Sequence, residues 1–231
     1  MKKHQFLTGN MLKLLAALSM LLDHAGLLYF PHEMGFRIAG RLAFPIFAFM
    51  IAEGCKYTRN RWRYWGMIAA LAAVCQAVYY FAAGDTYLSV LVTFSLAIPV
   101  VWVLQELRKK KSWLWGICFC ALVAAVAWMN RVLTIDYGFW GCMLPVWVAA
   151  VPGVMGLTIG LICLSADIGG IQWYSLLAVL PPAVLQRHCG QAEDEILLLY
   201  FLSPPSGPAS GPCMVDCLIS TYCLLAFFVV H

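Results

Sequence analysis

The chain has 231 residues, of which 63% are hydrophobic and only 11% are charged, and its mean hydropathy is +0.82. These values lie far outside the range of soluble proteins and exclude a soluble globular domain. The net charge of +4 does not indicate nucleic-acid binding, because the basic residues form short clusters between apolar segments, as the positive-inside rule requires.

Apolar runs of helix length follow one another along the chain. About 20 apolar residues span a bilayer as a helix, so there is room for about seven to nine crossings, and we predict an all-α, polytopic transmembrane helix bundle of about eight. The predicted helices cover residues 11–30, 36–55, 64–83, 88–106, 112–128, 137–151, 153–166 and 171–184. The last of them are short and are separated by breaks rich in glycine and proline.

Basic residues set the predicted orientation. Lys2 and Lys3 place the amino terminus in the cytoplasm, since positive charges beside a transmembrane helix stay on that side. With this helix count, the two dense basic clusters, at 56–63 and 108–111, fall on the same side. We therefore expect a multi-pass protein with a cytoplasmic amino terminus, surrounded by membrane lipids.

The chain contains ten cysteines, which raises the question of a disulfide or metal site. Most of them lie inside apolar segments, where cysteine behaves as a small hydrophobic residue. Cys118 and Cys120 point to different helix faces, and no Cys/His set has metal-ligand spacing. We predict no metal.

Ionisable side chains inside the first two predicted helices are costly in a bilayer and by default indicate a functional site. At about 1.5 Å per residue, His24 lies roughly 10 Å from the outer end of the first helix and Arg41 roughly 8 Å from the outer start of the second. The two could therefore face each other. Asp23 and His24 are adjacent in the sequence, so their side chains lie about 100° apart around the helix and cannot pair side by side. The alternative is a polar clip in which Asp23, His24 and Arg41 only join the helices.

Pro45 follows Arg41 by one helical turn. Proline has no amide hydrogen, so the carbonyl of Arg41 loses its intrahelical partner, and the second helix should kink there. In lipid, that carbonyl needs another partner from protein, water or ligand.

A basic cluster follows the second helix and consists of Lys56, Arg59, Arg61 and Arg63. Membrane topology alone explains it. The functional alternative is a rim that binds the phosphates of a nucleotide-like cofactor, for which arginine has suitable geometry. Lys13 lies on the same stripe of the first helix as His24, nearer the cytoplasm. Glu53 is either an ion-pair partner of Lys56 or Arg59 or a catalytic group.

Several motifs resemble the signature of the TraX family. They lie at residues 22–24, 40–49, 53–54 and 58–60, and the ten-residue stretch from 40 to 49 is the most specific of them. Asp136 and Tyr137, followed by Gly138 and Gly141, resemble a later motif of that family. Together these motifs cover about the first 150 residues.

The resemblance implies an integral membrane acetyltransferase of the bacterial cytoplasmic membrane, related to the conjugal pilin acetylase that acetylates a pilin amino terminus. A wider relationship to transmembrane acyltransferases is also implied, with cytoplasmic acetyl-CoA as donor and an acceptor on the far side. The acceptor stays open between a pilin amine, a glycan and another small molecule, because fold resemblance cannot identify it.

On this basis we hypothesise that His24 is the general base or a transient acetyl carrier, since an imidazole can exchange a proton near neutral pH. Asp23 would orient or charge-balance the site, and Arg41 would stabilise negative charge on the acetyl oxygen or hold the thioester end of acetyl-CoA. Lys13, Lys56, Arg59, Arg61 and Arg63 would receive the phosphates. Secondary candidates are Glu53, Asp136 and Tyr137.

Two other classes of protein remain open. In a small proton-coupled transporter, Asp23, His24 and Glu53 would form a relay. In a structural subunit of a secretion or conjugation machine, the charges would only clip helices together. The transporter explains the buried charges but not the ten-residue motif, and the sequence has no clear internal repeat of the kind that many transporters show.

The sequence changes character after about residue 184, so we divide it into an acyltransferase domain, 1–184, and a divergent tail, 185–231. The TraX resemblance implies a lysine-rich loop and a Phe-Tyr-Pro-x-His motif near the carboxyl end, and this chain has neither. Reading the codons of 185–206 in a shifted frame is compatible with both. We therefore predict a frameshift near residues 177–185, and the loss of that histidine could leave the chain inactive.

Overall fold

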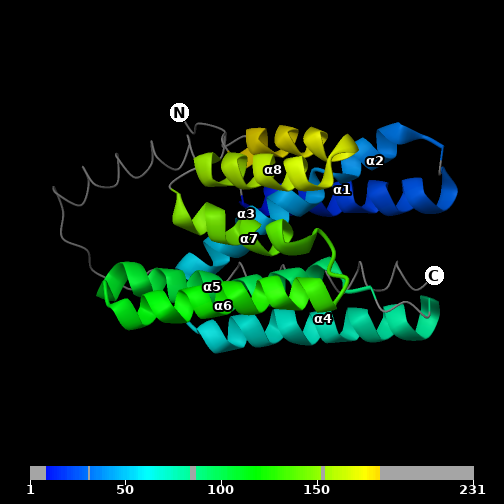
Figure 1. The fold of residues 1–231 in the computed structure, drawn as a ribbon. Helices are drawn as coiled ribbons and strands as arrows, with labels where there is room; N and C mark the ends of the chain where they lie inside the picture. The colour runs from blue at the N-terminus through cyan, green and yellow to red at the C-terminus, as the bar shows by residue number, and fades with distance from the viewer. Residues whose placement is uncertain (1–8, 31, 84–86, 152–153, 183–231) are drawn as a thin grey trace, which may run out of the picture.

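The computed structural model describes residues 9–30, 32–83, 87–151 and 154–182. In these ranges all regular elements are helices, as predicted, and they form one elongated bundle (Figure 1). The elements are α1 (Gly9–Tyr29), α2 (Met34–Gly40), α3 (Ala43–Tyr57), α4 (Arg61–Ala83), α5 (Val90–Lys110), α6 (Trp113–Val132), α7 (Gly138–Ala150), α8 (Val154–Ile168) and the 3-10 helix η1 (Gly170–Val179).

The helices follow the predicted apolar runs, although the last of these is a 3-10 helix rather than an α-helix. Among the described residues, three helical stretches are long and apolar enough to cross a membrane: Met34–Tyr57, Val90–Lys110 and Trp113–Val132. The helices α7 and α8 are apolar but shorter. The number of crossings and the side of the amino terminus stay predictions.

The second predicted helix is interrupted at the place where the kink was predicted. α2 ends at Gly40 and α3 begins at Ala43, with a turn at Arg41 and Leu42. In this turn the Arg41 amide donates to the carbonyls of Arg37 and Ile38, both at 3.2 Å. Pro45 explains the interruption, because it cannot donate to the Arg41 carbonyl and its ring crowds that carbonyl.

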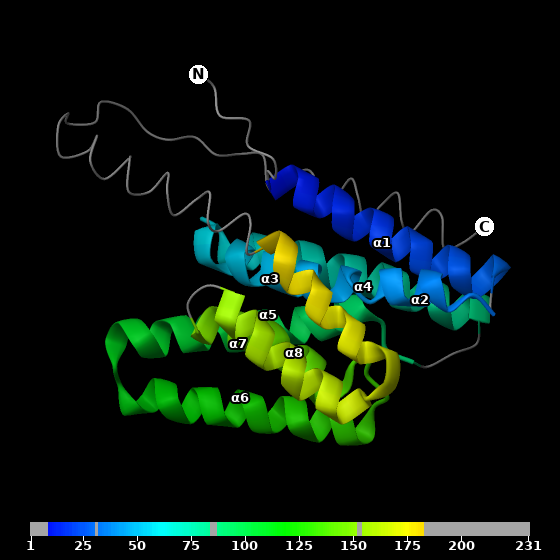
Figure 2. The same ribbon diagram turned by 90° about the horizontal axis from the view of Figure 1, so that it is seen from above.

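The helix α3 occupies the centre of the bundle. It packs against α1, α5, α7 and η1, and its residues 43–52 are all buried. The most specific TraX-like stretch therefore runs into the core. By contrast, α6 packs mainly on α5 and leaves most of its side chains exposed, as suits a lipid-facing helix (Figure 2).

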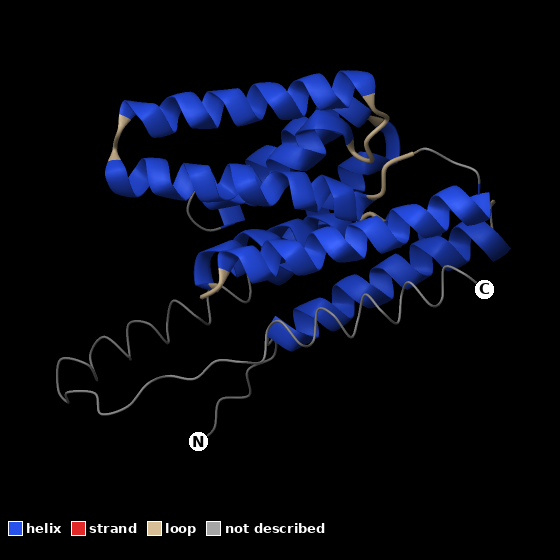
Figure 3. Ribbon diagram, turned by 90° about the horizontal axis from the view of Figure 1, so that it is seen from below, coloured by secondary structure: helices blue, strands red, loops and turns tan. Residues whose placement is uncertain are grey.

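The loops gather at the two ends of the bundle, with helical layers between them (Figure 3). One end carries loop segments 87–89 and 133–137 and the end of α1, and we call it the outer end after the predicted orientation. The opposite end carries turns 58–60 and 111–112, and we call it the cytoplasmic end.

Candidate functional site

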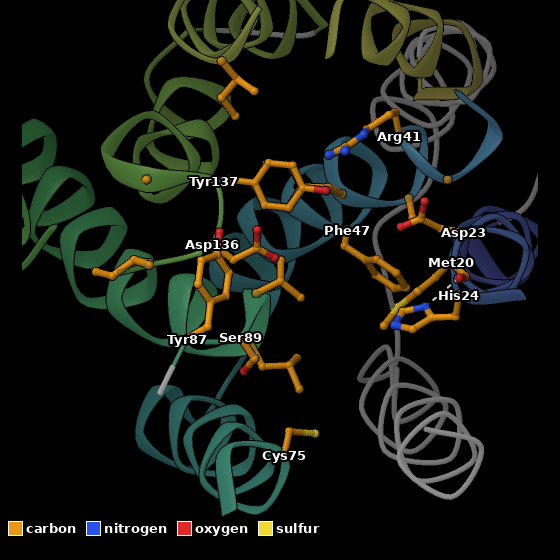
Figure 4. A pocket seen from close by; sticks show the side chains of 18 of the residues that line it. Met20, Asp23, His24, Arg41, Phe47, Cys75, Tyr87, Ser89, Asp136 and Tyr137 are labelled. Carbon is orange, nitrogen blue, oxygen red and sulfur yellow. Dashed lines mark hydrogen bonds between the residues drawn. The ribbon is translucent and has the colours of Figure 1, made fainter. Parts of the chain in front are cut away.

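A cavity of about 690 Å³ lies in the outer half of the bundle. Figure 4 shows side chains that line it. Its walls come from α1 to α5, from the loop between α6 and α7, and from the end of α8. Five side chains selected from the sequence line it together: Asp23, His24, Arg41, Asp136 and Tyr137. They converge from three separate parts of the chain.

The His24 ring is oriented by its own helix. Its Nδ1 lies 2.8 Å from the carbonyl oxygen of Met20, one turn earlier. A carbonyl can only accept, so Nδ1 carries the hydrogen, and in the neutral ring Nε2 keeps the lone pair. His24 lines the cavity, where Nε2 can act as a base.

Asp23 pairs with Arg37 of α2, with Oδ1 3.5 Å from a guanidinium nitrogen. The hypothesis that Asp23 orients or charge-balances the site stays a prediction, and the His24 ring itself is held by the carbonyl of Met20. Gly40 explains how α2 approaches so closely, because a Cβ there would overlap the side chain of Asp23. A side chain at this position would force Asp23 or α2 to shift.

Arg41 reaches from the turn between α2 and α3 into the cavity wall. Its guanidinium lies beside the hydroxyl of Tyr137 (Figure 4). On the other side it donates to Oε1 of Gln172 in η1, at 3.4 Å. Arg41 Nε is buried and has no acceptor among the described atoms.

Tyr137 forms an aromatic stack with the core of α3. The centre of its ring lies 3.9 Å from the centre of the Phe44 ring, and the two rings are nearly parallel. Phe44 in turn stacks on Phe94, with 5.4 Å between the ring centres. Tyr137 has φ 59°, a left-handed conformation that is uncommon for residues other than glycine. Such backbone strain is held in place by surrounding packing and is often found at functional sites.

The backbone around Asp136 is fixed by contacts with the start of α5. Its amide donates to the Leu88 carbonyl at 3.0 Å, and its carbonyl accepts from Thr93 Oγ1 at 3.0 Å. Gln76 of α4 holds the neighbouring loop by bonds to the Tyr87 carbonyl and the Ser89 amide. Burial raises the pKa of Asp136 to about 6.

Comparison with known families decides the relationship. The family model described as TraX protein matches residues 8–183, which include every described helix. This chain belongs to the TraX family. No curated protein and no solved structure matches it.

In this TraX family protein, the residues predicted to hold cofactor phosphates lie away from the cavity. None of Lys13, Lys56, Arg59, Arg61 and Arg63 is among its lining residues. Lys13 is buried on α1, whereas the other four lie at the cytoplasmic end. The structure therefore separates the two predicted sets by depth.

The cytoplasmic residues differ among themselves. Arg61 pairs with Glu106 at 2.8 Å, and its second guanidinium nitrogen lies 3.4 Å from Gln105 Oε1. The side chains of Arg59 and Arg63 are exposed. Lys56 lies over the ring of Tyr57, 4.9 Å from its centre.

Glu53 lies near the cytoplasmic end of α3, away from the cavity. The predicted tail, 185–231, lies outside the described residues, as do Lys2 and Lys3. The sequence argument missed Arg37, which partners Asp23, and Gln172, which partners Arg41. A lone glutamine in an apolar run was the available signal for Gln172.

Proposed function

We propose that this TraX family protein is an integral membrane acetyltransferase of a bacterial cytoplasmic membrane. It would move an acetyl group from cytoplasmic acetyl-CoA to an amine or hydroxyl acceptor at the membrane or its outer face. The observation that carries the proposal is the shared cavity of His24 and Arg41 in the outer half of the bundle. It combines a basic ring nitrogen with a buried hydrogen-bond donor.

Acetyl-CoA would supply the activated acetyl thioester. His24 Nε2 would take the proton from the attacking amine or hydroxyl and return it to the leaving sulfur. Arg41 would donate to the acetyl oxygen as it gains negative charge. Its Nε is suited to that role, because it is a buried donor with no acceptor among the described atoms.

The cytoplasmic end would bind the phosphates. Arg59 and Arg63 are exposed there and can donate two parallel hydrogen bonds to phosphate oxygens. Phe47, which lines the cavity, lies about 15 Å along α3 from Tyr57 at the cytoplasmic end. The thioester arm would have to pass between helices over that depth, along the stretch where Lys13 is buried.

The test is acetyl transfer in vesicles that contain the purified protein. Acetyl-labelled acetyl-CoA is supplied on the cytoplasmic side, and a pilin amino-terminal peptide or an oligosaccharide is supplied on the other side. Because the tail is predicted to be frameshifted, a chain with the restored frame is assayed beside the present one. Label on an acceptor is expected from at least the restored chain. If neither chain transfers label, the proposal is wrong.

The same vesicles test the transporter alternative. A relay of Asp23, His24 and Glu53 has less support, because Glu53 does not line the cavity that holds the other two. Proton flux without acetyl transfer would favour the transporter. If the vesicles showed no proton flux and no acetyl transfer, the structural subunit would be favoured.

A further inference from the structure

The 3-10 helix η1 is unusual in its length. It runs for ten residues, Gly170–Val179, whereas 3-10 segments longer than three or four residues are uncommon. Gly169 and Gly170, with φ 72° and 55°, make the turn from α8 in a conformation that glycine adopts without strain. A long 3-10 segment in this place needs an explanation from its contacts.

The 3-10 geometry aligns side chains three residues apart on one face. Gln172, Ser175 and Ala178 therefore form one row, and all three are at most 1% exposed. η1 packs against α2, α3 and α8. Two polar side chains are thus placed in the core, next to the turn that carries Arg41.

Gln172 is held from behind and points its amide at Arg41. Its backbone carbonyl accepts from Ser165 Oγ of α8 at 3.2 Å. Its Oε1 accepts from an Arg41 guanidinium nitrogen at 3.4 Å. Its Nε2 is buried without an acceptor among the described atoms. A buried donor without an acceptor lowers the stability of the fold.

The charges around Arg41 explain why an amide is useful there. Asp23 and Asp136 both line the same cavity, and the Asp136 carboxylate attracts the guanidinium of Arg41. A neutral amide oxygen can fix the direction of the guanidinium without cancelling its charge, whereas a carboxylate would pair with it. Arginine is long and has many rotamers, so a fixed direction requires such a contact.

We propose that Gln172 is a positioning residue that holds Arg41 toward the acetyl group. This inference rests on the acetyltransferase function proposed above. Gln172 is not among the residues lining the cavity, so it would act through Arg41 rather than on the substrate. Its loss should therefore lower kcat and leave the KM for acetyl-CoA unchanged.

A double-mutant cycle on acetyl transfer tests the proposal, using the chain that is active in the vesicle assay. Gln172→Met removes the oxygen at similar size and should lower kcat about tenfold. In an Arg41→Ala background the same change should have no further effect, because the group it positions is gone. An equal additional loss in that background, or no loss in either, would overturn the inference.

Two further variants serve as a replacement and as a control for Gln172→Met. Gln172→Asn keeps an amide but draws it away from Arg41, so it replaces Gln172→Met if that variant does not fold, and the same cycle applies. Gln105→Met is the matched control, because Gln105 also contacts an arginine at 3.4 Å, but at the cytoplasmic end. It should leave kcat within about twofold. If the unsubstituted chains transfer no acetyl group, the proposed function fails instead.

Discussion

Arginine side chains gather at both ends of the described bundle, but their surroundings differ. At the outer end, Arg37 and Arg41 are partly buried on a cavity wall and face carboxylates, a phenol and an amide. At the cytoplasmic end, Arg59 and Arg63 are exposed, and Arg61 is paired with Glu106. The same residue type is thus built into a cavity at one end and spread over a surface at the other.

This difference in burial indicates which arginines can take part in acetyl transfer and which can bind the phosphates of acetyl-CoA. A hydrogen bond or charge interaction is stronger in a buried, water-poor site than at an exposed surface, where solvent and salt screen it. Changes at the outer end should therefore act on kcat. Changes at the cytoplasmic end should act on the affinity for acetyl-CoA.

The largest expected effect is at His24. His24→Ala should lower kcat for acetyl transfer by about 10²- to 10⁴-fold, because it removes the proposed general base. The matched control is His32→Ala, since His32 is exposed between α1 and α2 and does not line the cavity. Transfer rates from labelled acetyl-CoA measure both. Full activity of a correctly inserted His24→Ala protein would remove the chemistry from the outer end.

Gly40 tests how closely α2 must approach Asp23. Gly40→Ala places a Cβ against the Asp23 side chain, so overpacking should cost roughly 1–3 kcal/mol of stability and disturb transfer. Gly35→Ala, on the same short helix, is the control because a Cβ there meets nothing within 4 Å. Thermal unfolding in detergent and kcat are the measurements. Equal behaviour of the two variants would show that the close approach is not required.

The sequence predicts features that depend on neighbouring residues better than contacts between residues that are far apart in the chain. Apolar runs give the helices, because burial in lipid or core requires only local composition. Counting residues from helix ends placed His24 and Arg41 at similar depth. The contact of Arg41 with Gln172 joins residues 131 apart, and no local pattern specifies which helices become neighbours. Arg37 was missed for the same reason, since its partner Asp23 lies on another helix.

Asp136, at the outer end, should make the stability of the protein depend on pH. Its pKa of about 6 exceeds the ordinary 3.8, so the folded protein binds more protons than the unfolded chain between these values. Stability should therefore fall as pH rises through about 4 to 6, by an amount on the order of 3 kcal/mol. Asp136→Asn should flatten this decline in detergent unfolding curves. Glu106→Gln, at the cytoplasmic end, should keep it; an unchanged decline in Asp136→Asn would assign it to another group.

The smallest expected effect is at the cytoplasmic surface, where it also tests the orientation of the bundle. Replacing Arg59 and Arg63 together by alanine should raise the KM for acetyl-CoA several-fold and leave kcat unchanged, because exposed phosphate contacts contribute uniform binding. The increase should shrink at high salt, since mobile ions screen exposed charges. Arg131→Ala is the matched control, as this arginine is exposed near the outer end of α6. If Arg131→Ala raised the KM instead, the donor would bind at the end that carries the cavity, and the division between the two ends would be reversed.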